Sequence, residues 1–247
     1  MELSIIIPTY NEVGRLPSTL GKLFSHLYSH YHGDYEIIIA DDGSTDGTAA
    51  WAERYRDEHP QVRVLPFPAN RGRGAAVRDA VFSANGRFIL EMDADGSVNE
   101  DAVTDFLKYF ARHGEVHLLI GSRMYPGAKI VTPQPWHRVL LGYGFLLCAR
   151  LLFRWPMIDR VNGYKMFRRE AAEDIFRHQF ENGFLAEAEV VYIAERRGWK
   201  VQELPIRWTD FRGSRVRPWR EIGRSLSGMI QILLRDRRGV YAKPEHG

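Results

Sequence analysis

Two aspartates at the end of an apolar run have a spacing that suits a divalent metal ion. Asp93-Ala94-Asp95 follows Phe88-Ile89-Leu90-Glu91-Met92, and if that run is a strand, alternation sends both carboxylates to the same side. One or two carboxylates completed by substrate phosphates and water is the usual way to hold Mg²⁺, and Mn²⁺ takes similar oxygen ligands. Helix capping is the alternative, but Asn99-Glu100-Asp101 supplies capping residues of its own. We therefore expect a Mg²⁺ or Mn²⁺ site at Asp93 and Asp95 that a nucleoside diphosphate completes.

Two further polar clusters could bind a nucleotide. Asp41 and Asp42 open the run DDGSTDG, where carboxylates can accept hydrogen bonds from a base N–H or a ribose hydroxyl. The same residues could also serve only as turn and cap residues. In Asn70-Arg71-Gly72-Arg73-Gly74 the glycines allow close backbone approach, and the arginines supply positive charge for a diphosphate near a helix N-terminus. This spacing is not that of a dinucleotide-binding fingerprint, and no P-loop motif occurs.

Alternating apolar runs and amphipathic stretches predict the elements that must position these residues. The expected strands are Leu3–Ile7, Glu36–Ala40, Val62–Leu65, Arg87–Met92 and Val116–Ile120, and the expected helices are Leu16–Ser29, Thr45–Glu58, Ala75–Ala84 and Glu100–His113. This repeat predicts an α/β fold with a single mostly parallel sheet flanked by helices. Ligands of such folds gather at the carboxyl ends of the strands. The polar clusters, with Pro8–Glu12 after the first strand and Gly121-Ser122-Arg123 after the fifth, should therefore meet at one edge.

Composition and charge narrow the function classes. With 45% hydrophobic and 26% charged residues over 247 positions, the chain fits a globular protein and neither a disordered nor a collagen-like one. The single cysteine, Cys148, excludes a disulfide framework and a cysteine-based zinc site, and no secretion signal is expected. Net charge is +3, yet residues 196–247 hold 13 Lys and Arg against 5 Asp and Glu. This basic end predicts contact with phosphate, on a membrane surface or a nucleic acid, unless it is only a solvated face.

Two segments of the second half have the pattern of interfacial helices. Val139–Phe153 is the most apolar run, but at fifteen residues it is shorter than the roughly 20 that span a bilayer. Its aromatic and basic flanks, within about residues 136–156, suit a helix lying in a membrane interface, with a buried core helix as the alternative. Trp219–Asp236 predicts a second, basic amphipathic helix. We therefore divide the chain into a main domain, 1–218, and a C-terminal helix and tail, 219–247, frayed after Val240.

Five motifs stand in a fixed order along the chain: IIIPTYNE at 5–12, DDGSTDGT at 41–48, NRGRGAAVR at 70–78, DADG at 93–96 and GSR at 121–123. Together they resemble the GT-A glycosyltransferases of family 2. DRVNGYK at 159–165, ELPIRW at 203–208 and GSR at 213–215 resemble the polyprenyl-phosphate branch of that family, which holds dolichyl-phosphate β-glucosyltransferases and dolichol-phosphate mannosyltransferases. The resemblance covers residues 3 to about 218 and implies the GT-A fold. GAAVR at 74–78 and WTD at 208–210 lean towards UDP-glucose as donor, with GDP-mannose second.

The resemblance also implies roles for particular residues. The nucleotide pocket would be lined by Pro8, Tyr10, Glu12, Asp41, Asp42, Arg71 and Asp93. Asp93 and Asp95 would hold the metal-bound diphosphate and act in catalysis together with Arg123. The acceptor's phosphate would meet Arg123, Arg138 and Arg215. The chain departs from the branch at Gly142, where a serine is usual, and at Arg215, where a lysine is usual.

The implied reaction is an inverting, metal-dependent sugar transfer to polyprenyl or dolichyl phosphate. A lipid phosphate is already deprotonated near neutral pH, so its oxygen can attack the anomeric carbon without a strong base. The expected partners are a nucleotide-sugar, the lipid and a membrane surface, and no nucleic acid. We expect a cytoplasmic protein that is peripheral at the inner face of the membrane, with a homodimer or a membrane partner left open.

Two rival functions stay open at this point. A family 2 transferase acting on a soluble or saccharide hydroxyl would need a carboxylate base, with Glu187, Glu189 or Asp159 as candidates. Glu187 and Glu189 could equally contact the sugar or its neighbouring groups, or belong to a merely acidic helix. A non-catalytic membrane-binding module would keep the fold without the activity.

Overall fold

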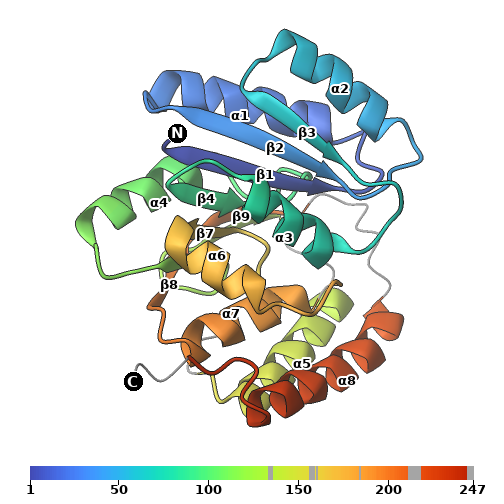
Figure 1. Cartoon of the computed structure of the whole chain (residues 1–247), viewed down its shortest axis with the longest axis vertical. Coiled ribbons are helices and arrows are strands. Elements are labelled where there is room, and N and C mark those ends of the chain that lie inside the picture. Colours follow the sequence, from blue (N-terminus) through green and yellow to red (C-terminus); the bar gives the residue numbers. More distant parts are fainter. Residues whose placement is uncertain (133–135, 156–158, 160, 184, 211–217, 244–247) are drawn as a thin grey trace.

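A seven-stranded sheet lies at the centre of the protein (Figure 1). The computed structural model describes residues 1–132, 136–155, 159, 161–183, 185–210 and 218–243. The strand order is β3-β2-β1-β4-β7-β5-β8. The strands are β1 (Leu3–Thr9), β2 (Tyr35–Asp41), β3 (Val62–Pro66), β4 (Phe88–Glu91), β5 (Leu118–Ser122), β7 (Lys165–Arg168) and β8 (Val201–Pro205). All pairs are parallel except those of β7, which runs antiparallel to β4 and β5. The predicted mostly parallel sheet is confirmed.

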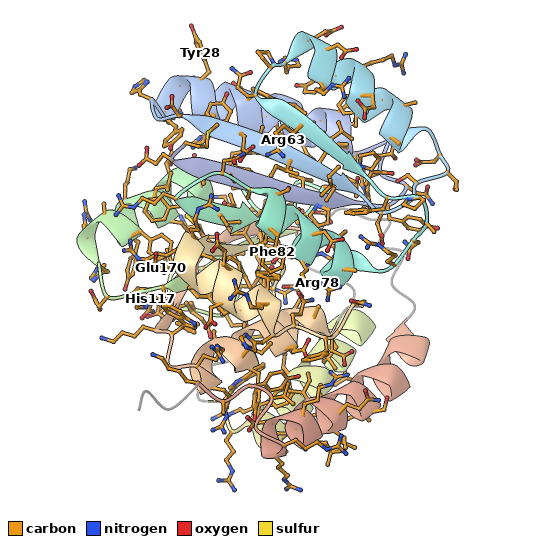
Figure 2. All side chains as sticks on the ribbon, viewed as in Figure 1. Tyr28, Arg63, Arg78, Phe82, His117 and Glu170 are labelled. Atoms are coloured by element: carbon orange, nitrogen blue, oxygen red, sulfur yellow. The ribbon has the colours of Figure 1, made fainter. Side chains whose placement is uncertain are left out.

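Helices cover both faces of this sheet (Figure 1). One face packs against α1 (Leu16–His30), α2 (Thr48–Glu58) and α4 (Asp101–Arg112), and the other against α3 (Arg73–Ser83), α6 (Arg169–Arg177) and α7 (Ala186–Arg196). Strand alternation separates the two cores, because Ile5 and Ile7 face the first set of helices while Ile6 faces the second. On the outer side of α1, Tyr28 points into solvent with 87% of its surface exposed (Figure 2).

The C-terminal half adds two long helices beyond α7. α5 (Trp136–Phe153) and α8 (Pro218–Arg237) lie side by side (Figure 1). Ala149 and Phe153 of α5 are buried in the same core as Met229 and Ile232 of α8. The apolar segment around 136–156 therefore has one face in the core, while some of its leucines stay exposed.

Several elements differ from the expected ones. A small parallel sheet of β6 (Lys129–Thr132) and β9 (Arg207–Thr209) was not anticipated, and neither was β7 between β4 and β5. The four residues of β7 carry a charge at each end, so no apolar alternation marks them as a strand. α2 begins at Thr48 rather than Thr45, because Asp46 Oδ1 accepts the Thr48 N–H at 3.0 Å.

The chain end is also more ordered than expected. Fraying after Val240 was predicted, and this is wrong for Tyr241, whose side chain is fully buried in the core shared with α5 and α8. Its ring packs 6.1 Å from that of Tyr192 on α7. An isolated aromatic residue near a terminus carries no periodic pattern that would reveal such packing from the sequence.

Candidate active site

The predicted polar clusters meet at one edge of the sheet. β1, β2, β4 and β5 all end there, and β7 begins there because it runs in the opposite direction. The register places Lys165, the first residue of β7, opposite Glu91 on β4 and Ile120 on β5. The loop that enters β7 therefore joins the loops that follow the parallel strands, as expected for a ligand site in an α/β fold.

Asp93 and Asp95 form the accessible acidic pair of this edge. The Asp93 side chain is 47% exposed, and its Oδ1 lies 2.8 Å from Arg73 Nη2. Asp95 Oδ1 accepts the Ser97 N–H at 2.9 Å and the Ser97 hydroxyl at 2.5 Å. Among the described residues no group of three or more His, Cys, Asp or Glu could hold a metal ion. Two hard carboxylates of this kind fit Mg²⁺ or Mn²⁺ only with further oxygens from a substrate.

Gly163 leaves room for the contact between Arg73 and Asp93. A Cβ atom at this position would lie 2.6 Å from Arg73 Nη2 and 2.9 Å from Asp93 Oδ2. Gly163 also presents its carbonyl oxygen to Arg73 Nη2 at 3.4 Å. The glycine of the DRVNGYK motif thus leaves space in which the ends of two charged side chains meet.

Behind Asp93 lies a buried network of two cations and two carboxylates. Arg73 Nη1 pairs with Glu91 Oε1 at 2.5 Å and also with Glu187 Oε1, while Lys165 Nζ pairs with Glu187 Oε2. Burial raises the pKa of Glu91, and Arg73 and Lys165 oppose that shift. Burial lowers the pKa of Lys165 to about 8, although the negative charges of Glu91, Asp93 and Asp159 raise it. The four charges balance, so Asp93 is the negative group that this part of the site presents outward.

Sequence reasoning gave Arg71 and Arg73 a role in binding the diphosphate, but it did not assign Glu91 or Lys165 to the site. The available signal was a charged residue inside an apolar strand, as in FILEM, because such a charge must find a buried partner. Arg71 was also placed in the nucleotide pocket, but its guanidinium pairs with Asp79 at 2.7 Å and lies over the Phe67 ring. Of Arg71 and Arg73, it is Arg73 whose side chain turns towards the acidic pair.

Asp41 and Asp42 organise the loops of the proposed nucleotide pocket. Asp41 is buried and accepts the Ser44 N–H at 3.1 Å and the Ser44 hydroxyl at 2.5 Å. Asp42 is buried as well, and its two oxygens accept the N–H groups of Arg71 at 2.9 Å and Gly72 at 2.8 Å. The loop after β2 thereby holds residues 70–74, the glycine loop that leads into α3.

The loop after β1 contributes its own ion pair. Arg15 donates to both oxygens of Glu12, from Nε at 2.6 Å and from Nη2 at 2.5 Å. Burial lowers the pKa of Arg15, but Glu12, Asp95 and Asp93 raise it, and the net shift is upward. Arg15 therefore lies in the field of the acidic pair, which sequence reasoning missed. Pro8 is half-buried and Tyr10 is 43% exposed at the start of this loop.

The three arginines assigned to the acceptor differ in what the structure describes. Arg123 is held by the fully buried Asp159, which accepts its Nη2–H at 2.8 Å, its Nε–H at 3.0 Å and its backbone N–H at 2.7 Å. The guanidinium also lies 5.4 Å from the Trp208 ring. Arg138 is in the first turn of α5, but its side chain is not among those described, and Arg215 lies outside the described residues.

Glu187 and Glu189, two positions apart on α7, have different surroundings. Glu187 belongs to the network behind Asp93. Glu189 is fully buried and accepts the N–H groups of Phe180 and Glu181 and the hydroxyl of Tyr241. Burial raises the pKa of Glu189, and these hydrogen bonds oppose the shift. A spacing of two on a helix turns the two side chains to different sides, so they do not act together.

The chain is similar in sequence to proteins of a known family. The model of the family "Glycosyl transferase family 2" matches residues 4–176. A dolichyl-phosphate beta-glucosyltransferase of Drosophila melanogaster is 34% identical over 92% of this chain and 73% of its own length. The human protein of the same name is 31% identical over 91% of this chain and 74% of its own length.

A solved structure shares the fold. Glucosyl-3-phosphoglycerate synthase from Mycobacterium tuberculosis, crystallised with Mn²⁺, UDP and phosphoglyceric acid, superimposes with a TM-score of 0.64 at 18% identity. The match covers 100% of this chain and 80% of that one. The architecture is therefore the GT-A fold, with a mostly parallel sheet between helices.

Proposed function

Because this chain is a glycosyltransferase that belongs to glycosyl transferase family 2, we propose that it transfers glucose from UDP-glucose to a polyprenyl phosphate. The sequence relatives named dolichyl-phosphate beta-glucosyltransferase support both the sugar and the class of acceptor. The transfer inverts the anomeric centre in a single displacement, so that an α-linked donor yields a β-linked lipid phosphate sugar.

The burial and pairing of the acidic residues favour a phosphate acceptor over a hydroxyl acceptor. A hydroxyl acceptor needs a carboxylate base, and the candidates Glu187, Glu189 and Asp159 are all buried and paired with cations or hydrogen-bond donors. A buried carboxylate whose oxygens are already engaged by such partners is not placed to take a proton from an incoming hydroxyl. An acceptor that arrives deprotonated, as a phosphate monoester does near neutral pH, needs no such base. The hydroxyl-acceptor alternative loses its support here.

The donor's diphosphate is proposed to bind where Asp93 and Asp95 lie. A bound Mg²⁺ or Mn²⁺ supplies positive charge that stabilises the departing diphosphate. Arg73 pairs with Asp93 and holds this carboxylate in place, and Arg15, which pairs with Glu12, adds positive charge to the same region. Asp159 orients the guanidinium of Arg123, which we assign to the acceptor's phosphate together with Arg138 and Arg215. Positioning and charge neutralisation then account for most of the catalysis.

The lipid acceptor requires a membrane surface, and α5 and α8 are the candidates to meet it. No helix of the described residues is long and apolar enough to cross a bilayer. Both helices nevertheless leave rows of apolar side chains exposed, namely Leu140, Leu147 and Leu151 of α5 and Leu226, Ile230 and Leu234 of α8. Exposed arginines accompany them at 150, 154, 237 and 238. Apolar rows with basic neighbours suit peripheral binding to an anionic lipid surface.

Transfer of radiolabel to an organic phase tests this function. We expect label from UDP-glucose, in the presence of Mg²⁺ or Mn²⁺, to appear in short polyprenyl phosphate dispersed in detergent. GDP-mannose serves as the competing donor and a soluble sugar as the competing acceptor. Asp93→Asn and Asp95→Asn should each lose most of the transfer and keep the circular dichroism of the folded protein. An empty organic phase with every donor, while UDP still binds, would refute the lipid-phosphate acceptor.

A further inference from the structure

The end of the chain reaches a buried carboxylate on α7. Tyr241, which follows α8, donates its hydroxyl to Glu189 Oε1 at 2.5 Å, and Arg235 Nη1 lies 3.3 Å from the same oxygen. Both Tyr241 and Glu189 are fully buried. A carboxylate without solvent must be satisfied by such donors. The position of Glu189 Oε1 is therefore set by Arg235 and Tyr241, which lie in the C-terminal segment, residues 235–241.

The other oxygen of Glu189 holds a short segment before α7. Glu189 Oε2 accepts the N–H groups of Phe180 at 2.9 Å and Glu181 at 2.6 Å. Arg235 reinforces this arrangement, because its Nη1 lies 2.8 Å from Glu181 Oε1. One carboxylate thus ties the C-terminal segment to residues 179–183.

Residues 179–183 in turn hold the start of α3. The Gly74 N–H donates to Asn182 O at 2.8 Å, and Gln179 Nε2 donates to Gly74 O at 3.2 Å. Arg78 lies where α3 faces this part of the molecule, and its Nη1 donates to Gln179 O at 3.3 Å (Figure 2). A Cβ atom on Gly72 or Gly74 would collide with this segment. The glycine loop is thus packed directly against residues 179–183.

The start of α3 carries Arg73, the residue that contacts Asp93. We propose that Glu189 is a positioning residue for the donor site. Through residues 179–183 it sets the position of the glycine loop and of Arg73, and Tyr241 orients its carboxylate. This inference rests on the proposed function, because it takes the Asp93 edge as the site of the donor's diphosphate. The C-terminal segment then contributes to donor binding without touching the donor.

Two tyrosine variants separate this role from general packing. Tyr192 on α7 donates its hydroxyl to Asp236 of α8 at 2.7 Å, so it also ties α7 to α8, but through a carboxylate other than Glu189. Tyr241→Phe and Tyr192→Phe each remove one hydroxyl that donates to a carboxylate. Calorimetric titration with UDP and Mn²⁺ measures the consequence without any acceptor. We expect the Kd for UDP to rise about three- to tenfold in Tyr241→Phe and to change less than about twofold in Tyr192→Phe, because a hydrogen bond to a charged group contributes only a few kcal/mol.

Transfer kinetics and amide hydrogen exchange of the same variants provide two further tests. In transfer assays the donor KM of Tyr241→Phe should rise with its Kd, while kcat and the acceptor KM stay within about twofold of wild type. Amide hydrogen exchange across 70–78 should accelerate in Tyr241→Phe and not in Tyr192→Phe, because the Gly74 N–H bond to Asn182 loosens. Glu189→Gln, which keeps the shape of the side chain, should shift both measurements in the same direction.

The outcomes distinguish this inference from the proposed function. Wild-type affinity for UDP in Tyr241→Phe, or equal losses in the two tyrosine variants, would overturn the role of Glu189 and leave the proposed function standing. A wild-type protein that binds neither UDP nor GDP would remove the donor site itself, and both proposals with it.

Discussion

The buried pair of Glu187 and Lys165 offers the sharpest test of the network behind Asp93. Glu187→Gln leaves Arg73 and Lys165 with Glu91 as their one buried anion in the network. Removing one partner of a buried ion pair typically costs about 3–5 kcal/mol. For a chain of this size each kcal/mol lowers Tm by about 2–4 °C, so we expect a fall of roughly 6–20 °C. Lys165→Met should cost a similar amount, because it leaves an excess of negative charge.

The double variant distinguishes charge balance from lost packing. Glu187→Gln with Lys165→Met retains Arg73 and Glu91, and the buried network is again neutral. We expect the double variant to lose at least about 2 kcal/mol less than the sum of the two single losses, as for coupled neighbours. Equilibrium unfolding in urea, followed by circular dichroism, measures all four proteins. Additive losses, within about 0.5 kcal/mol, would refute the network.

A matched surface pair provides the control. Lys108 and Asp105 on α4 lie 3.6 Å apart with side chains 67% and 65% exposed. Solvent screens such a pair, so Asp105→Asn should change the free energy of unfolding by less than about 0.5 kcal/mol.

Three further outcomes are expected. Gly163→Ala should displace the ends of the Arg73 and Asp93 side chains, and we expect weaker Mn²⁺ binding in calorimetry with little loss of stability. Gly14→Ala, where a Cβ meets open space, is the control, and unchanged Mn²⁺ binding would contradict the close approach. Asp159→Asn removes the charge that holds Arg123, and we expect a loss of about 1–3 kcal/mol and a higher KM for the lipid acceptor, with wild-type values in both as the opposing result. Burial raises the pKa of Glu36, but hydrogen bonds from Ser4, Arg63 and Asn85 lower it below 4.5, so its stabilisation is complete above that pH and is lost as the pH falls through the lowered pKa. Acid unfolding curves of wild type and Glu36→Gln should therefore converge as the pH falls through this lowered pKa, and parallel curves would argue against the assignment.

The sequence by itself determined the class of fold and the edge of the sheet that bears the site. Strand alternation at β1 and β2 and the helical spacing in α1 and α4 are local patterns, and burial of an apolar face makes them reliable. The polar motifs follow these strands directly, so a parallel arrangement brings them together wherever the helices pack. Asp93 could be identified as a ligand candidate because the apolar run Phe88–Met92, which predicts a strand, ends immediately before it.

The tertiary structure decided which charged side chains face one another. Arg71 lies in the loop before α3 and Arg73 is the first residue of that helix, and the docking of α3 against residues 179–183 turns Arg73 towards Asp93. Lys165 meets the Glu91 network because β7 inserts between β4 and β5, a pairing across more than seventy residues that no local pattern encodes. Tyr241 is buried only because α8 returns to α7. Contacts of this kind depend on long-range packing, since the same residues in isolation would be solvated and unpaired.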